Sequence, residues 1–114
     1  MFELVNLHLQ DRRQACQAMA GVGTGLPGQQ QMADKMLFFT FVARGLSMPG
    51  AAILKQEMLS KGGEAALHHQ AVVFGVERTD VVLAGTWRQY KELCKRLRLQ
   101  QFRLPQLAEE LEEA

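Results

Sequence analysis

The sequence contains few cysteines and no excess of charge of either sign. Its two cysteines, Cys16 and Cys94, stand too far apart for the C-x-x-C spacing of zinc or thiol redox sites. We therefore expect both to be buried free thiols. The formal net charge of +1 over 114 residues provides no general attraction to nucleic acid or anionic lipid.

Long hydrophobic runs are also absent, since no segment approaches the roughly 18 apolar residues that a membrane span requires. The first part of the chain carries Glu3, Asp11, Arg12 and Arg13, which would interrupt the apolar core of a secretory signal peptide. We therefore expect a cytoplasmic protein with no membrane partner.

The composition suits a single domain over residues 1–114. Apolar residues make up 47% of the chain, and a chain of this size buries roughly two-thirds of the surface that its unfolded form exposes. Strands are predicted over residues 2–7, 36–43, 71–76 and 81–84, and helices from residues 9, 50 and 87. The order β-α-β-α-β-β-α favours an α/β fold, a two-layer sandwich with a four-stranded mixed sheet and about three helices.

The clearest helix begins near Pro49, whose fixed φ suits a first helical turn. Leu54 and Met58 stack at i, i+4 spacing on one face of this helix. The pair Gly62-Gly63 then supplies the left-handed residue on which a helix ends.

A second strong helix begins after Thr86, whose hydroxyl can form a capping box with Gln89. Its apolar face is the strongest amphipathic pattern in the chain and must be covered by another element. That face consists of Trp87, Tyr90, Leu93, Cys94 and Leu97. Pro105 then interrupts the chain, and residues 105–114 are predicted to form an acidic helix or tail.

The predicted strand at residues 36–43 is continuously apolar, which is typical of a strand covered on both faces or placed at the centre of a sheet. Residues 77–80 form a charged connection with turn character. The strands on either side of this connection are therefore predicted to pair as an antiparallel hairpin.

Residues 21–31 combine four glycines, a proline and three glutamines, which predicts a flexible loop. The loop contains a G-x-G-x-x-G pattern between Gly23 and Gly28. A dinucleotide-binding fingerprint must follow a strand, whereas this pattern follows a predicted helix and contains Pro27. A flexible helix-to-strand connection explains the glycines better than nucleotide binding does.

Several blocks of sequence match a known pattern. They are ILKQEMLS at residues 53–60, GGEAA at 62–66, VERTDVVLAGT at 76–86, and QFRL at 101–104 followed by QLAEEL at 106–111. The segment MADK at 32–35 is similar to an MAPK segment in the same pattern, and QFRL to its QPFGL close. From residue 32 to 111 the chain resembles the amino-terminal extension of clostridial and delta-proteobacterial dihydropteroate synthases.

This resemblance implies a place in pterin and folate metabolism without the synthase reaction. In that family a TIM barrel after the extension joins a pterin pyrophosphate to p-aminobenzoate, and a barrel of about 250 residues cannot fit into this chain. The chain would be the extension of a longer synthase or a free-standing relative. Ala52, Asp34 and His68-His69 depart from the family pattern, so polar contacts made by its asparagine at position 52 are absent here.

A candidate ligand or partner surface consists of Lys55, Glu57, Glu64, Thr79, Asp80 and Thr86. Turn and cap residues on a rigid scaffold can bind ligands, although an Asx turn and a helix cap also explain the last three residues. Glu57 and Glu64 could act as an acid and a base only if a cleft raised the pKa of one of them, and solvated carboxylates are the alternative. The sequence indicates no catalytic residue and no cofactor.

A basic cluster on the last long helix is the one local departure from neutrality. Its candidate phosphate-binding residues are Arg88, Lys91, Lys95 and Arg96, with Arg98 and Arg103 close by. Glutamates in residues 109–113 can instead fold back onto the cluster or pair with a second copy. Few aromatic residues lie among these cations, so nucleic acid is not a favoured partner.

His68 and His69 are adjacent, so their rings diverge on a strand or a helix and cannot both bind one metal ion. No metal site is therefore predicted.

Three functions remain open. The first is a non-catalytic accessory domain that packs against a synthase barrel or a second copy. The second is a sensor or binding domain for a pterin-like small molecule at the candidate surface. The third is phosphate or nucleic-acid binding through residues 88–103. Exposed strand edges are consistent with a homodimer.

Overall fold

The computed structural model describes residues 2–69 and 77–114. It divides the chain into two compact units, Met1–Leu37 and Phe38–Ala114, which are described separately below. One domain over residues 1–114 therefore stays a prediction.

The first unit contains two helices, α1 (Arg12–Gly21) and α2 (Leu26–Met36). Asp11 caps α1, because its carboxylate accepts a hydrogen bond from the Gln14 backbone amide at 2.8 Å. Arg12 joins the two helices by an ion pair with Asp34 at 2.6 Å and a hydrogen bond to the Gln30 carbonyl. Asp34, which departs from the family pattern, therefore has a structural role within this unit.

Two sequence predictions for this unit are wrong. Residues 2–10 form no regular element, because an alternating pattern makes a strand only when a neighbouring strand supplies hydrogen bonds. Most of the predicted loop at 21–31 belongs to α2, which opens with Gly25 as its N-cap and Pro27 in its first turn. Proline is favoured at that position of a helix, so Pro27 indicates the beginning of a helix rather than a loop.

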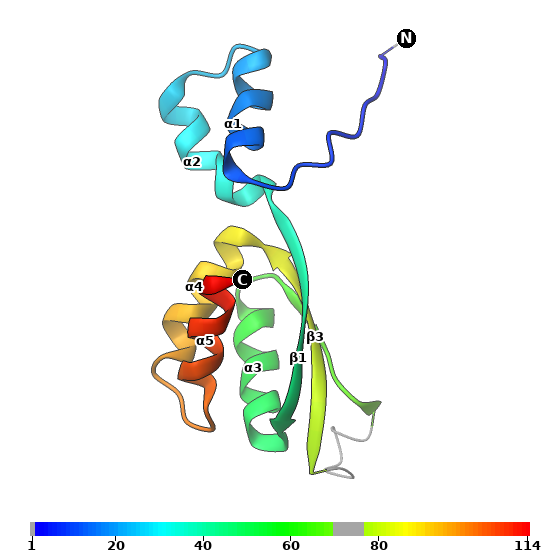
Figure 1. The fold of residues 1–114 in the computed structure, drawn as a ribbon, viewed down its shortest axis with the longest axis vertical. Coiled ribbons are helices and arrows are strands. Elements are labelled where there is room, and N and C mark those ends of the chain that lie inside the picture. Colours follow the sequence, from blue (N-terminus) through cyan, green and yellow to red (C-terminus); the bar gives the residue numbers. More distant parts are fainter. Residues whose placement is uncertain (1, 70–76) are drawn as a thin grey trace. The chain divides into compact units, whose positions relative to one another are not determined.

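The second unit contains a three-stranded antiparallel sheet in the order β1-β3-β2 (Figure 1). The strands are β1 (Phe38–Ser47), β2 (Glu64–Ala66) and β3 (Arg78–Thr86). The sheet is therefore not mixed, and the described residues hold three strands rather than the predicted four. The predicted strand at 71–76, and with it the predicted hairpin, lies outside the described residues.

The central strand is β3, not the apolar segment around residue 40. Every second residue of β3 is buried, the residues between them are exposed or partly exposed, and Val81 and Leu83 are fully buried. β1 lies at an edge of the described sheet and also alternates, so Phe39 and Phe41 face the core while Phe38 remains 63% exposed. The expectation that this segment is covered on both faces is therefore wrong.

β3 also begins earlier than predicted. Arg78 and Thr79 pair with the end of β1 instead of forming a turn, with Ser47 opposite Arg78 and Leu46 opposite Thr79. Thr79 points inward and is only 5% exposed, and its hydroxyl donates to the Asp80 carbonyl at 2.8 Å. Because this hydrogen bond satisfies the buried hydroxyl, Thr79 can occupy a buried position in the alternating pattern of β3.

Three helices, α3 (Met48–Ser60), α4 (Trp87–Leu97) and α5 (Leu104–Glu113), pack on one face of the sheet (Figure 1). The predicted helices from residues 50 and 87 are therefore confirmed, and the acidic segment at 105–114 is mostly helical. Together with α1 and α2, they make five helices in the described chain.

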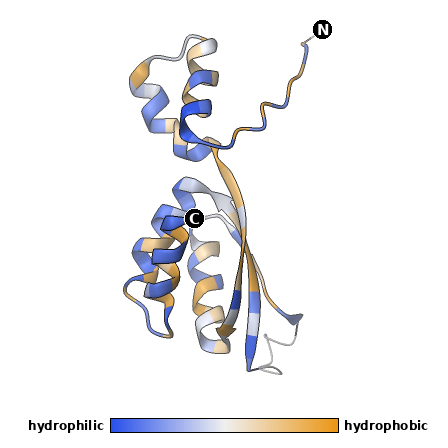
Figure 2. Cartoon of the chain, viewed as in Figure 1, coloured by the Kyte–Doolittle hydropathy of each residue, from blue (hydrophilic) through white to orange (hydrophobic). Residues whose placement is uncertain are grey.

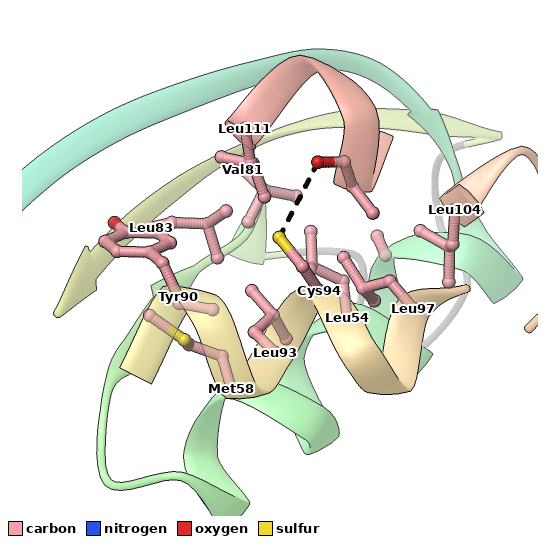
Figure 3. Packing of buried hydrophobic residues seen from close by; sticks show 13 residues of the cluster. Leu54, Met58, Val81, Leu83, Tyr90, Leu93, Cys94, Leu97, Leu104 and Leu111 are labelled. Carbon is pink, nitrogen blue, oxygen red and sulfur yellow. Dashed lines mark hydrogen bonds between the residues drawn. The ribbon is translucent and has the colours of Figure 1, made fainter. Parts of the chain in front are cut away.

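The core of this unit forms where α4 meets β3, α3 and α5, as Figure 3 shows. The apolar face predicted for α4 is buried except at Trp87, which is partly buried. The hydroxyl of Tyr90 donates to the Phe39 carbonyl of β1 at 2.9 Å. The thiol of Cys94 donates to the Ala108 carbonyl of α5 at 3.6 Å. One helix thus contacts both the sheet and α5.

The helix ends agree with the sequence signals. Thr86 and Gln89 form the predicted capping box at the start of α4. Gly62 follows the end of α3 with φ of +88°, which glycine adopts without the strain that a Cβ introduces. At residue 63 glycine is favoured for a different reason, which is lack of space. A Cβ there would lie 2.9 Å from the Ala84 carbonyl oxygen.

Cys94 should react far more slowly with a thiol reagent than Cys16. Burial, assisted by nearby Glu112, raises the pKa of the Cys94 thiol to about 11, so little nucleophilic thiolate forms at pH 8. Cys16 is partly exposed, contrary to the sequence prediction. Ellman's reagent should show one fast thiol in the native protein and the second only after unfolding. Loss of the fast phase in Cys94→Ala, rather than in Cys16→Ser, would contradict this assignment.

Gly62→Ala should lower the free energy of unfolding by about 1 kcal/mol, because alanine is strained at a positive φ. Gly21→Ala is the matched control, since a Cβ there meets no atom within 4 Å and φ is not positive. Urea denaturation of both variants measures the difference. Equal stabilities would show that the conformation at residue 62 is not strained for alanine.

Candidate functional site

A groove of about 670 Å³ lies in the second unit, where β1 forms one wall and α5 with its preceding turn forms the other. Its lining residues are Phe41, Val42, Ala43, Arg44, Gly45, Leu46, Ser47, Arg78, Phe102, Arg103, Leu104, Gln106, Leu107, Glu110, Leu111 and Ala114. Every one of these residues belongs to the same compact unit.

The β1 wall is shaped by a bulge, where the register with β3 shifts between Ala43 and Leu46. Gly45 lies in the bulge with φ of +70°. Its backbone amide donates to a carboxylate oxygen of Asp80 at 2.9 Å, and its carbonyl accepts from Arg78 at 2.9 Å. The second carboxylate oxygen of Asp80 accepts from Arg44 at 3.2 Å. These contacts hold both arginines beside the groove.

The turn before α5 shapes the opposite wall. Phe102 and Arg103 are consecutive non-glycine residues with φ of +59° and +64°, a conformation that costs each about 1 kcal/mol or more. A Cβ on Gly50 would lie 3.2 Å from the Cβ of Phe102, so the start of α3 must approach this turn closely. Arg103 donates twice to the side-chain oxygen of Gln106, at 3.0 and 2.6 Å.

The groove combines apolar and cationic side chains. Phe41, Leu46 and Leu107 are partly buried against the core, and Figure 2 shows that the first half of β1 is hydrophobic. Three arginines, Arg44, Arg78 and Arg103, line the same groove with one glutamate, Glu110. The lining of the groove therefore combines apolar surface with an excess of positive charge.

The structure does not gather the predicted ligand surface into one site. Lys55 on α3 donates to the Ala65 carbonyl at 2.8 Å, and Glu57 forms an ion pair with Arg96 at 3.1 Å. The carboxylate of Glu64 accepts from the Ala65 amide at 3.2 Å. Each of these side chains thus holds its own part of the second unit together.

The other three predicted residues lie along β3. The Thr79 hydroxyl accepts from the His68 backbone amide at 3.1 Å, Asp80 organises the bulge, and Thr86 caps α4. A second depression, of about 530 Å³, contains Thr79 and Asp80 but none of the other four predicted residues. None of the six lines the larger groove, although Asp80 bonds directly to its Arg44 and Gly45. The role of the six as a ligand surface stays a prediction.

The predicted phosphate-binding residues all lie on α4, but ion pairs engage several of them. Arg96 pairs with Glu57, and Lys95 pairs with Glu92 at 3.3 Å. Neighbouring Arg98 pairs with Glu112 of α5 at 2.5 Å, so the acidic segment does fold back onto the basic one. The hydrogen bond from Arg98 lowers the pKa of Glu112.

The groove itself was missed by the sequence prediction. Its walls come from segments far apart in the chain, and the pairing partner of β1 cannot be read from local pattern. One signal was present, since a glycine inside an apolar strand often marks a bulge. The predicted strand ends at residue 43, so Gly45 lies outside it.

The histidine pair also differs from expectation. The rings of His68 and His69 do not diverge but stack, with centroids 4.5 Å apart and planes inclined by 22°. In residues 2–69 and 77–114, no three histidine, cysteine, aspartate or glutamate side chains gather at one point where a metal ion could bind. No helix in those ranges has the length and apolar character to span a bilayer.

Comparison with known proteins gives one similarity that supports the sequence resemblance in part. Over 94 residues the chain is 31% identical to a bifunctional dihydropteroate synthase/dihydropteroate reductase of Helicobacter pylori. The matched region is 82% of this chain but only 25% of that protein. No family model matches the chain, and no solved structure matches it. The chain is thus similar to one part of a folate-pathway enzyme.

Arg103→Gly should be more stable than Arg103→Ala by about 1 kcal/mol, because only glycine relaxes at the positive φ of this residue. Both variants lose the hydrogen bonds to Gln106. The difference between their free energies of unfolding therefore measures the backbone strain at residue 103. The family pattern that the sequence resembles has glycine in this part of its QPFGL close. Urea denaturation measures the free energies of unfolding, and equal values would contradict the expected strain.

Proposed function

We propose that this chain is a non-catalytic accessory module of folate metabolism that works by binding another protein. The groove between β1 and α5 is the observation that carries the proposal. It offers apolar surface and three arginines on a preformed frame. Interfaces of this kind combine buried apolar contacts with charges that select the partner.

The polar residues near the groove support binding rather than chemistry. Asp80, the carboxylate nearest the β1 wall, accepts hydrogen bonds from Gly45 and Arg44. Arg103 bonds to Gln106, and Arg78 to the Gly45 carbonyl. A general acid or base must instead be free to exchange a proton with a substrate. Glu110 is the only carboxylate side chain among the residues that line the groove, so it stands without a second carboxylate to share acid and base roles.

The similarity to a dihydropteroate synthase/reductase points to the partner. Because the chain spans about a quarter of that relative's length, the proposed partner is a dihydropteroate synthase catalytic domain. A second copy of the chain is the other candidate carried over from the sequence.

A pterin-like small molecule is the alternative occupant. The groove volume of about 670 Å³ lies within the range of small-molecule sites, and its arginines would suit an anionic group. A thermal shift with a pterin pyrophosphate that disappears in Arg44→Gln would favour this alternative. A thermal shift only with the synthase domain would favour the accessory module.

The purified chain should form a complex with the dihydropteroate synthase domain of its source organism and should form no dihydropteroate by itself. Val42→Lys should weaken that complex by at least about tenfold, because it places a charge on apolar groove surface. Val22→Lys is the matched control, since Val22 is 83% exposed and lies outside the groove. Biolayer interferometry gives the affinities. Dihydropteroate formation by the chain alone, or failure to bind the synthase domain, would overturn the proposal.

A further inference from the structure

β1 has an unpaired long edge in the described sheet. It is a strand of 10 residues at one end of the order β1-β3-β2, so its backbone pairs with β3 on one side only. An unpaired edge presents N–H and C=O groups that can accept another strand. Proteins use such edges to bind extended peptides, with a pocket or helix beside the edge to select the side chains.

The groove lies along this edge. Its lining includes the consecutive residues 41–47 of β1. Residues 41–43, which precede the bulge, alternate between the two faces of the sheet. A groove that touches all three of them therefore passes along the backbone edge. The opposite wall is α5 and its preceding turn, which supply Phe102, Arg103 and Leu107.

We propose that this groove binds an extended acidic segment of a partner protein, which adds to β1 as a further strand. The inference rests on the proposed function, since it specifies how the accessory module contacts its partner. Backbone hydrogen bonds along β1 supply a general affinity, and the side chains of the groove select the sequence.

The side-chain chemistry favours a segment in which apolar and acidic residues alternate. On the inner face, apolar side chains of the added strand would contact Phe41 and Leu107, which are partly buried, and Phe102, which is 47% exposed. On the outer face Val42 is 47% exposed and extends the apolar surface. Acidic residues would meet the guanidinium groups of Arg44, Arg78 and Arg103. Each of these groups already donates within the chain, and its remaining N–H groups can donate to a carboxylate.

Charge also argues against a second copy of β1 as the occupant. Residues 38–47 contain one arginine and no acidic residue. Two copies of β1 paired edge to edge would therefore add positive charge to a groove that already holds three arginines and one glutamate. Like charges placed together in an interface oppose association, so the favoured strand comes from a different, acidic sequence.

Nucleic acid is a poorer match to the groove, because the groove lacks the charge and the stacking surfaces that nucleic acid requires. The groove wall carries Glu110 among its cations, and its apolar residues include one exposed aromatic ring, Phe102. Single-stranded nucleic acid needs a continuous positive groove with several stacking platforms. An added strand instead uses the apolar side chains and the backbone edge together.

The test uses a fluorescein-labelled octapeptide of alternating valine and glutamate as the probe, with the full chain as receptor. Fluorescence anisotropy should show saturable binding. Methylation of alternate backbone amides of the peptide should weaken binding at least tenfold, because it removes the donors that a β-ladder needs. A lysine-for-glutamate peptide should also bind at least tenfold more weakly. Absence of saturable binding, or equal binding of the methylated peptide, would overturn the proposal.

The receptor variant Arg44→Gln/Arg103→Gly removes two charges from the groove. Arg44 is exposed and its ion pair with Asp80 contributes little to stability, while glycine suits the positive φ at residue 103. The fold should therefore survive, and affinity for the acidic peptide should fall at least tenfold. Arg13→Gln/Lys35→Gln removes two charges from α1 and α2 and should leave affinity unchanged within twofold.

Hydrogen exchange separates failure of this inference from failure of the proposed function. If the synthase domain binds and slows amide exchange in residues 41–47, the strand-addition mode is supported. If it binds without that protection, and Arg44→Gln/Arg103→Gly binds equally well, this inference is wrong while the accessory role stands. A chain that dimerises by β1 pairing, shown by protection of residues 41–47 on self-association, would also overturn it.

Discussion

The second unit depends on the burial of one face of α4. Tyr90, Leu93, Cys94 and Leu97 are at most 1% exposed, and burying a side chain of this size contributes roughly 1.5–3 kcal/mol. The same face contacts β3 beneath it and α5 beside it (Figure 3). The capping box at Thr86 fixes where α4 begins, and therefore which residues face inward. The rest of the unit is positioned by this helix.

The groove lies where the helices around α4 leave part of β1 uncovered. Because β3 takes the central position, β1 lies at an edge of the sheet that residues 2–69 and 77–114 form, with Phe39 and Phe41 packed inward. Among those residues, no strand pairs with the other side of β1. The ion pair between Arg98 and Glu112 and the thiol hydrogen bond of Cys94 hold α5 against α4. These contacts fix the position of α5, and the space between α5 and β1 is the candidate groove.

Local features of the fold could be predicted from the sequence, whereas pairings could not. The end of α3 at Gly62, the capping box of α4 and its apolar face all depend on residues within one or two helical turns. The order of the strands depends on contacts between residues about 40 apart, such as Phe41 with Leu83, and local periodicity holds no record of them. The site was missed for the same reason, since it lies between elements. Among the candidate polar residues, Thr86 was recognised as a possible helix cap, and the structure shows that bond. Thr79 and Asp80 lie in β3 rather than in the expected turn.

The phenol of Tyr90 has a consequence for how the site responds to its surroundings. Burial raises the pKa of this hydroxyl to about 12, so it remains a donor to the Phe39 carbonyl at every physiological pH. The edge strand is therefore tethered to α4 by a bond that does not titrate, and α4 in turn holds α5. A segment that binds as proposed would meet two walls whose spacing is already set, so little ordering of the receptor would oppose its binding.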